Sequence, residues 1–179
     1  KGLQHPLFCV LLRLMKRELI AEIVGTYILV FAGTGAIVIE TLTGAMGHVG
    51  IAMTFGLVVT VLVYTLGHIS GAHFNPAVSI AFAFMRELEL KRLLPYIGAQ
   101  LLGAVLASAT LYLLFIEEVT AVSELSYLGA TLPRGSELQS FILEFILTFI
   151  LMFVIVGSAV HEKAIKSFAG IAIGATVGL

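Results

Sequence analysis

The polar residues best placed to act on a small ligand lie in one glycine-punctuated stretch, His68-Ile-Ser-Gly-Ala-His-Phe-Asn-Pro-Ala77, between two apolar runs. Asn75 stands where a helix N-cap belongs, and Pro76 stands at the first helical position, where its missing N–H costs nothing. As a helix, residues 76–85 would be about 15 Å long, half of a ~30 Å hydrocarbon core. Because the charged pair Arg86-Glu87 follows at once, we place Asn75 near the middle of a membrane.

Irregular backbone at this depth is stable only inside protein or beside a water-filled cavity. A helix that begins there directs the positive end of its dipole toward any solute in the cavity. The amide group of Asn75 can donate hydrogen bonds to the same solute. Gly71 permits a tight path that turns backbone carbonyls toward the cavity. The expected acceptors, opposite an apolar wall, are the carbonyl groups of Gly71, Ala72, His73 and Phe74. The stretch therefore predicts a constriction for a small neutral solute.

Two histidines and two carboxylates are further candidates for chemistry. His68 and His73 could be metal ligands by type, but two ligands without a third make a poor site, so neither a metal nor a cofactor is expected. We expect His68 to hydrogen-bond within the loop, with its ring or backbone near the pore. Glu22 and Glu144 lie inside apolar runs, where ionisable residues mark function by default. We interpret both as structural, each accepting hydrogen bonds from the backbone of a re-entrant loop.

The composition is that of a membrane protein. The chain is 59% hydrophobic and 12% charged, with a mean hydropathy of +1.08. Apolar runs predict spanning helices at residues 18–39, 48–66, 95–116 and 138–160, and a fifth begins at residue 168. The hydroxyl groups of Thr54 and Thr60 on the second span, and of Ser79 on the half-helix, are expected only to bond back to their own helix backbone. The net charge of −1 indicates no nucleic-acid partner.

The basic residues predict the orientation of the chain. Nine of the ten Lys and Arg residues precede the first span, lie between the half-helix and the third span, or follow the fourth. Because basic loops stay in the cytoplasm, the N-terminus is predicted to be cytoplasmic and Arg134 external. The expected parts are a cytoplasmic arm (residues 1–17), a first repeat (18–116), an extracytoplasmic loop (117–137) and the start of a second, incomplete repeat (138–179). The protein is expected to be multi-pass, in a plasma membrane or cell inner membrane.

Two segments of the chain match each other. Glu22-Ile-Val-Gly-Thr-Tyr-Ile-Leu-Val-Phe31 matches Glu144-Phe-Ile-Leu-Thr-Phe-Ile-Leu-Met-Phe153, and Gly50-Ile-Ala-Met53 matches Gly170-Ile-Ala-Ile173. Three spans separate the copies, so they would cross the membrane in opposite directions, an inverted repeat with its site at the repeat interface. A second Asn-Pro-Ala is expected about 120 residues after the first. The printed residues would then hold about four and a half spans and one half-helix, and a polypeptide limited to them is expected to conduct nothing and to be poorly stable.

The stretch Gly67-His-Ile-Ser-Gly-Ala-His-Phe-Asn-Pro-Ala-Val78 resembles the first signature loop of the aquaporin, or major intrinsic protein, family. The helices that carry Glu22 and Glu144 match this family too, so the resemblance covers residues 18–179. Leu132-Pro-Arg-Gly-Ser136 and Phe168-Ala-Gly-Ile-Ala-Ile-Gly-Ala-Thr176 look most like the nodulin-26-like subgroup, plant and bacterial channels for glycerol, metalloid acids and water.

The resemblance implies an all-α membrane protein, a right-handed bundle of six spanning helices plus two re-entrant half-helices that meet at the midplane. It also implies a homotetramer with one pore per subunit. Asn75, followed by Pro76 and Ala77, would be one of two Asn donors that orient the permeant. Phe55, twenty residues before Asn75, would line the narrow outer filter.

The leading interpretation is a passive channel for water and small uncharged solutes that excludes protons and ions. Glycerol and neutral metalloid acids, such as boric, silicic or arsenous acid, are the candidate solutes, although the phenyl ring of Phe55 favours water over bulky polyols. A strict water channel stays open as an alternative. So do a membrane-junction or scaffold protein and a coupled transporter, although a transporter would need a charged relay at the midplane. No catalytic constellation is present, so the sequence does not predict an enzyme.

Overall fold

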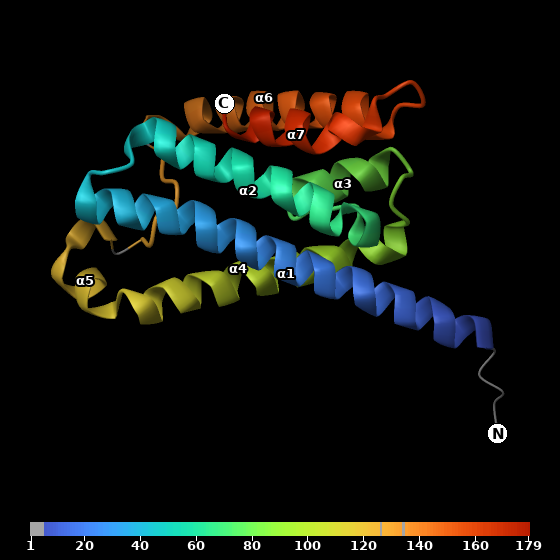
Figure 1. Ribbon diagram of the computed structural model, residues 1–179, viewed down its shortest axis with the longest axis horizontal. Coiled ribbons are helices and arrows are strands. Elements are labelled where there is room, and N and C mark those ends of the chain that lie inside the picture. Colours follow the sequence, from blue (N-terminus) through green and yellow to red (C-terminus); the bar gives the residue numbers. More distant parts are fainter. Residues whose placement is uncertain (1–5, 126, 134) are drawn as a thin grey trace.

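The computed structural model describes residues 6–125, 127–133 and 135–179, and every element in these ranges is a helix or a helical turn (Figure 1). Four helices are long and apolar enough to cross a membrane, over Met15–Thr43, Gly47–Ser70, Leu90–Leu114 and Glu137–Val160. They correspond to the four predicted spans. Arg134, predicted to be external, lies outside the described residues.

The elements follow one another in a simple order. The long helices are α1 (Pro6–Thr43), α2 (Gly47–Ser70), α4 (Leu90–Leu114) and α6 (Glu137–Ile155), and a π-helical turn, Val156–Val160, extends α6. The shorter helices are α3 (Pro76–Phe84), α5 (Ile116–Ala121) and α7 (Ala169–Val177), with 3-10 turns at Ser123–Leu125 and Lys166–Phe168.

Two helices begin earlier than the sequence predicted. From residue 6 the expected N-terminal arm is continuous with the first span, because helix-forming residues follow Pro6 and Pro is well suited to the first helical turn. The third span was expected to start at Pro95, but α4 starts at Leu90 and Pro95 lies inside it. Glu89, with φ −63° and ψ 132°, has the extended backbone of an N-cap, so the helix begins one residue later.

The helices pack as a group of three and a pair. α1 lies against α2 and α4, α6 lies against α7, and α2 joins the group to the pair by packing on α7. This contact is close, because a Cβ at Gly56 would lie 2.7 Å from the carbonyl oxygen of Gly174. α2 and α7 carry the matched Gly-Ile-Ala segments, so the two copies of the sequence repeat meet at this contact.

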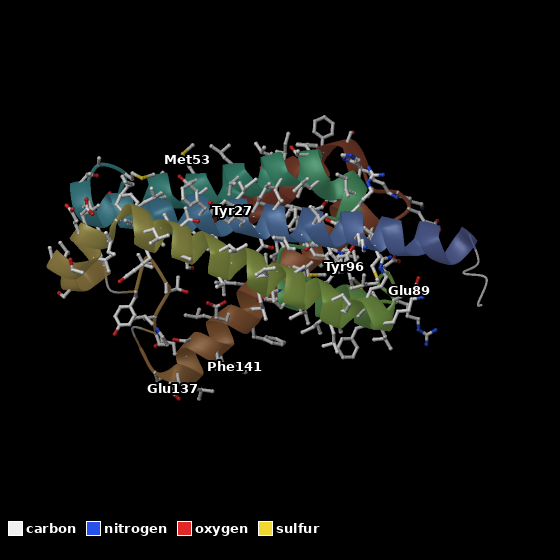
Figure 2. The ribbon with its side chains drawn as sticks, turned by 90° about the horizontal axis from the view of Figure 1, so that it is seen from below. Tyr27, Met53, Glu89, Tyr96, Glu137 and Phe141 are labelled. Carbon is white, nitrogen blue, oxygen red and sulfur yellow. The ribbon has the colours of Figure 1, made fainter. Side chains whose placement is uncertain are left out.

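The core is small and α6 contributes little to it. The main cluster of buried side chains comes from α2, α3, α6 and α7, and consists of Val59, Val78, Ile155, Ala169 and Ile173. Only 6% of the most apolar part of α6 is buried. Phe141 is 69% exposed, and Figure 2 shows it near the Glu137 end of α6, which stands apart from α1 and α2. Such apolar exposure suits a lipid-facing surface or one covered by further protein.

Candidate functional site

The polar stretch forms a loop that turns back into the bundle and ends in the short helix α3. Figure 1 shows α2 and α3 ending at the same end of the bundle, so residues 71–75 must turn back between them. Gly71 ends α2 with φ +88°, and Ala72 and Phe74 also have left-handed backbones, with φ +53° and +48°. Such conformations cost on the order of 1–3 kcal/mol for a residue other than Gly. The loop therefore depends on contacts that hold it in place.

Asn75 is the N-cap of α3 and keeps one end of its amide free. Its Oδ1 accepts a hydrogen bond from the backbone N–H of Ala77 at 2.8 Å, and Pro76 occupies the first position of the helix. The side chain is exposed, and its Nδ2 donates to none of the described residues. The cap thus fixes the orientation of the amide, with its two N–H donors available to a ligand.

The backbone of the loop is polarised. None of the carbonyl oxygens of residues 71–74 accepts a hydrogen bond from a described residue. The N–H groups of His73 and Phe74, by contrast, both donate to the carboxylate of Glu22, at 3.1 and 2.8 Å. The loop therefore has its donors bound on the protein side and its acceptors free.

Glu22, on α1, is the anchor of the loop and has no exposed surface. Its Oε1 also accepts from the Ser70 hydroxyl at 2.6 Å, and its Oε2 also accepts from Nε2 of Gln100 at 2.8 Å. With the two backbone N–H groups, the carboxylate accepts four hydrogen bonds, which is the number its lone pairs accommodate. A buried carboxylate is stable when it is satisfied in this way.

Two further side chains connect α3 to this anchor. Ser79 of α3 is fully buried; its Oγ lies 3.0 Å from Nδ1 of His73 and accepts a hydrogen bond from Nε2 of Gln100 at 2.9 Å. Gln100, on α4, thus bridges Glu22 and Ser79. The ring of His73 also packs against Phe82, with ring centroids 4.5 Å apart. These contacts fix the direction of α3 and with it the position of its N-cap.

A chain of contacts leads from the loop to the charged end of the bundle. The Tyr96 hydroxyl donates to the carbonyl of Ser70 at 2.9 Å. The guanidinium of Arg92 donates to the Tyr96 hydroxyl at 3.4 Å and forms an ion pair with Glu18. Figure 2 shows Tyr96 close to this end of α4. Surface charges are thus connected to the loop through one buried tyrosine.

Phe55 lies on α2 and is half-buried against α1. Its ring occupies the space that a Cβ at Gly33 would need, and the ring of Phe74 similarly fills the space beside Gly25. The two glycines therefore allow aromatic rings from α2 and the loop to approach the backbone of α1 closely. The ring of Phe55 is placed by this contact.

Comparison with known proteins identifies the family. The sequence matches the model of the family described as Major intrinsic protein over residues 12–179. The chain belongs to the major intrinsic protein family. The solved aquaglyceroporin from Plasmodium falciparum matches this fold with a TM-score of 0.78 at 33% sequence identity, covering 92% of this chain and 69% of that chain. The all-α fold class predicted from the sequence is confirmed.

Curated plant members of the family are more similar in sequence. Nodulin-26 of Glycine max is 52% identical over 162 residues, which make up 90% of this chain and 58% of nodulin-26. Aquaporin NIP3-1 of Arabidopsis thaliana is 51% identical over 166 residues, 91% of this chain and 51% of that protein. The predicted likeness to the nodulin-26-like subgroup is confirmed, and the chain spans little more than half the length of these relatives.

Within this fold, the contacts of some residues agree with their predicted roles and those of others do not. Glu22 contacts the loop backbone, whereas its repeat counterpart Glu144 is exposed on α6 and makes no hydrogen bond with a described residue. The expectation that His68 hydrogen-bonds within the loop is wrong: its side chain is exposed in the last turn of α2 and bonds to no described residue. His73 makes the hydrogen bond instead, because the left-handed turns direct it inward to Ser79.

The sequence reasoning missed several residues of the anchor. Thr54 and Thr60 bond back to their own helix as expected, to the carbonyls of Gly50 and Gly56. Ser79 was expected to do the same, but it bonds to His73 and Gln100 instead. Other members that were missed are Ser70, Tyr96 and Gln100. The available signal was the recurrence of polar side chains four residues apart at positions 96 and 100 of an otherwise apolar run.

Proposed function

We propose that the protein is a membrane channel for water and small uncharged solutes, glycerol and neutral metalloid acids among them, that excludes protons and ions. The observation that carries this proposal is the polarised loop, in which two backbone N–H groups bind Glu22 while the carbonyls of residues 71–74 and the amide N–H₂ of Asn75 bond to no described residue. The similarity to proteins named aquaporins and to a solved aquaglyceroporin supports it. The function is that of a passive pore rather than of an enzyme.

The mechanism follows from the chemistry of the loop. A hydroxyl-bearing solute that gives up its water shell can donate to the row of carbonyls contributed by Gly71, Ala72, His73 and Phe74, with His68 near its entrance. At the same time it accepts from Asn75, whose position is set by Pro76 and Ala77. The positive end of the α3 dipole opposes cations at this point. A neutral solute therefore regains its hydrogen bonds, whereas an ion does not.

Two further residues are proposed to shape the pore without hydrogen-bonding to the solute. Phe55 narrows the outer filter with a ring that offers no hydrogen bond, which favours water over larger polyols. Glu144 is proposed to hold a second re-entrant loop, as Glu22 holds the first. A carboxylate on the exposed face of an apolar helix is costly in a membrane unless protein covers it. Glu22, the repeat counterpart of Glu144, accepts four hydrogen bonds.

The assembly and orientation are proposed on the charge pattern and the family likeness. The protein forms a homotetramer, with the N-terminus and residues 1–17 in the cytoplasm and residues 117–137 outside. The first repeat covers residues 18–116 and the second begins at residue 138. The basic residues flanking the spans favour this orientation, in a plasma membrane or cell inner membrane.

Liposomes that contain the full-length protein test the function directly. Under osmotic gradients of sucrose, glycerol and boric acid, stopped-flow light scattering should show faster water movement than in empty liposomes, and re-swelling with at least one of the two permeant solutes. A channel for water alone would shrink fast and re-swell no faster than empty liposomes. A solute flux that requires a pH gradient would indicate a coupled transporter, and no flux of any kind would indicate a scaffold protein.

A further inference from the structure

The hydroxyl group of Tyr96 contacts the polar loop at the point where its row of free carbonyls begins. Tyr96 lies on α4 and is 1% exposed, and its hydroxyl donates to the carbonyl oxygen of Ser70 at 2.9 Å. Ser70 is the last residue of α2. The next carbonyl, that of Gly71, is the first of the four that accept from no described residue. Tyr96 therefore binds the last carbonyl before the free row.

The side chain of Ser70 is held separately from its carbonyl. Its hydroxyl donates to Oε1 of Glu22 at 2.6 Å and accepts from the backbone N–H of Ala72 at 3.2 Å. The side chain thus belongs to the anchor of the loop, whereas the carbonyl depends on Tyr96. The last carbonyls of a helix have no partner within that helix. Because Ser70 is buried, its carbonyl would be costly to leave without a donor.

Arg92, one helical turn before Tyr96, determines the direction of this hydrogen bond. A tyrosine hydroxyl has one proton and can also accept, whereas a guanidinium only donates. A guanidinium nitrogen of Arg92 lies 3.4 Å from the Tyr96 hydroxyl, and its central carbon lies 5.6 Å from the centre of the ring. The ion pair with Glu18 on α1 holds Arg92 in this position. The proton of the tyrosine is thus left for Ser70.

Apolar contacts hold the ring of Tyr96 without help from its hydroxyl. The ring belongs to an apolar cluster that joins α1, α3 and α4, and the other side chains of this cluster are Leu19, Phe82, Ala83, Leu88 and Leu93. The ring of His73 also lies near it, with centroids 5.2 Å apart. Figure 2 shows Tyr96 within the bundle, close to the Glu89 end of α4. Removal of the hydroxyl would therefore change one hydrogen bond and little packing.

We propose that Tyr96 is a positioning residue for permeation and that Arg92 acts through it. By binding the Ser70 carbonyl, Tyr96 fixes the end of α2 and with it the first carbonyl of the free row. The inference rests on the proposed function, because the row is a path for solutes only in a channel. A fixed start sets the spacing at which a permeating molecule meets successive acceptors. Without the bond from Tyr96, the end of α2 gains freedom and this spacing is lost.

Stopped-flow light scattering of liposomes with the full-length protein tests the effect on permeation. The variant is Tyr96→Phe, and the matched control is Tyr112→Phe on the same helix, where the side chain is exposed and bonds to no described residue. We expect Tyr96→Phe to lower water flux per reconstituted protein about threefold, the effect of about one net hydrogen bond. The flux should also become more dependent on temperature, and Tyr112→Phe should match the wild type.

A general loss of stability would have a different signature from a displaced loop. Fewer folded channels lower the flux without changing its temperature dependence. A fall in Tyr96→Phe with the temperature dependence of the wild type would therefore overturn the inference, and so would an unchanged flux.

Hydrogen exchange, followed by mass spectrometry of the full-length protein in detergent, tests the positioning without any flux. In Tyr96→Phe, the amides of residues 67–78 should exchange about threefold faster, for the loss of one hydrogen bond, while those of α7 keep the wild-type rate. Faster exchange along the whole chain would make Tyr96 a general packing residue and overturn the inference. Local exchange in a protein whose wild type conducts no water would confirm the positioning of the loop and contradict the proposed function instead.

A double-mutant cycle tests the part of Arg92. Arg92→Lys keeps the charge that pairs with Glu18 but loses the planar group that reaches the Tyr96 hydroxyl. Alone, it should speed the exchange of residues 67–78. In the Tyr96→Phe background it should add nothing, since Arg92 acts through Tyr96. Additive effects of the two changes would show that Arg92 stabilises the loop by another route and would overturn its assigned role.

Discussion

Glu22 has no exposed surface, yet its carboxylate is surrounded by donors rather than by apolar side chains. Two of these donors are backbone N–H groups of a loop in which Gly71, Ala72 and Phe74 have positive φ values. Their hydrogen bonds to a charged group offset the cost of those conformations, since such bonds contribute about 1.5–3 kcal/mol each. One side chain thus stabilises the shape of the loop.

Changing Glu22 to Gln should be strongly destabilising. An amide offers one oxygen in place of two and turns its own N–H₂ group toward donors, so at least two donors lose their acceptor, at about 1–3 kcal/mol each. We expect a clear fall in the thermal unfolding temperature of the detergent-solubilised protein and a loss of water flux. Thr26→Val is the control one helical turn away, because the buried Thr26 hydroxyl bonds to no described residue. It should leave both readouts near wild type; a similar loss in both variants would remove the special role of Glu22.

Changing Phe55 to Ala should widen the proposed outer filter. Glycerol flux through the full-length protein should rise relative to water flux, measured by stopped-flow light scattering in liposomes. Leu57→Ala, on the same helix but 59% exposed, should leave the ratio unchanged. A ratio that stays constant in Phe55→Ala would mean that this ring does not limit the passage of solutes.

At the scale of the helices, the contact between α2 and α7 leaves little free space. A Cβ at Gly174 would overlap the Thr60 hydroxyl and the carbonyl of Gly56. Gly174→Ala should therefore destabilise the protein by about 1–3 kcal/mol, the usual cost of overpacking. Gly98→Ala is the matched control on exposed α4 surface, with nothing within 4 Å of the added methyl group. Size-exclusion profiles after heating should show aggregation of Gly174→Ala first; equal profiles would contradict the close packing.

The sequence was sufficient to predict the four spans and the half-helix, because each span is a long apolar run and the half-helix carries its own start signal in Asn75 and Pro76. The short helix α5 lies partly in the segment predicted to be a loop. The ends of the spans were harder to predict. α4 starts five residues before Pro95, since a proline can lie inside a helix as well as begin one. α1 likewise extends beyond the apolar run, because helix propensity continues where hydropathy falls.

The free groups of the candidate site followed from the sequence, but its supports did not. The cap and the loop conformation depend on local rules for Asn, Pro and Gly, which can be applied to one sequence. Gln100 donates to Glu22 across 78 residues of the chain, and Ser79 is connected to Glu22 not directly but through Gln100. Such a partnership depends on how helices pack, and a single polar residue in an apolar run does not indicate which helix it will face.

Across the whole molecule, charge is distributed unequally between the two ends of the bundle. We predict that the end with residues 117–137 faces away from the cytoplasm. A cysteine at the exposed Thr131, in a Cys9→Ser background, should react with a membrane-impermeant maleimide on intact cells. Glu162→Cys, exposed at the opposite end, should react only after the cells are opened. The reverse pattern would invert the proposed orientation.

The central claim is that solutes pass Asn75 and that this constriction excludes protons. Asn75→Asp, in the full-length protein, replaces an amide donor with an acceptor and places a carboxylate at mid-membrane, at a cost on the order of 3 kcal/mol. The decisive measurement is water flux in liposomes, recorded together with the internal pH under a pH gradient. The wild type should speed water flux and keep the gradient, and the variant should lose water flux or leak cations. Equal water flux and equal proton exclusion in the two proteins would contradict the claim.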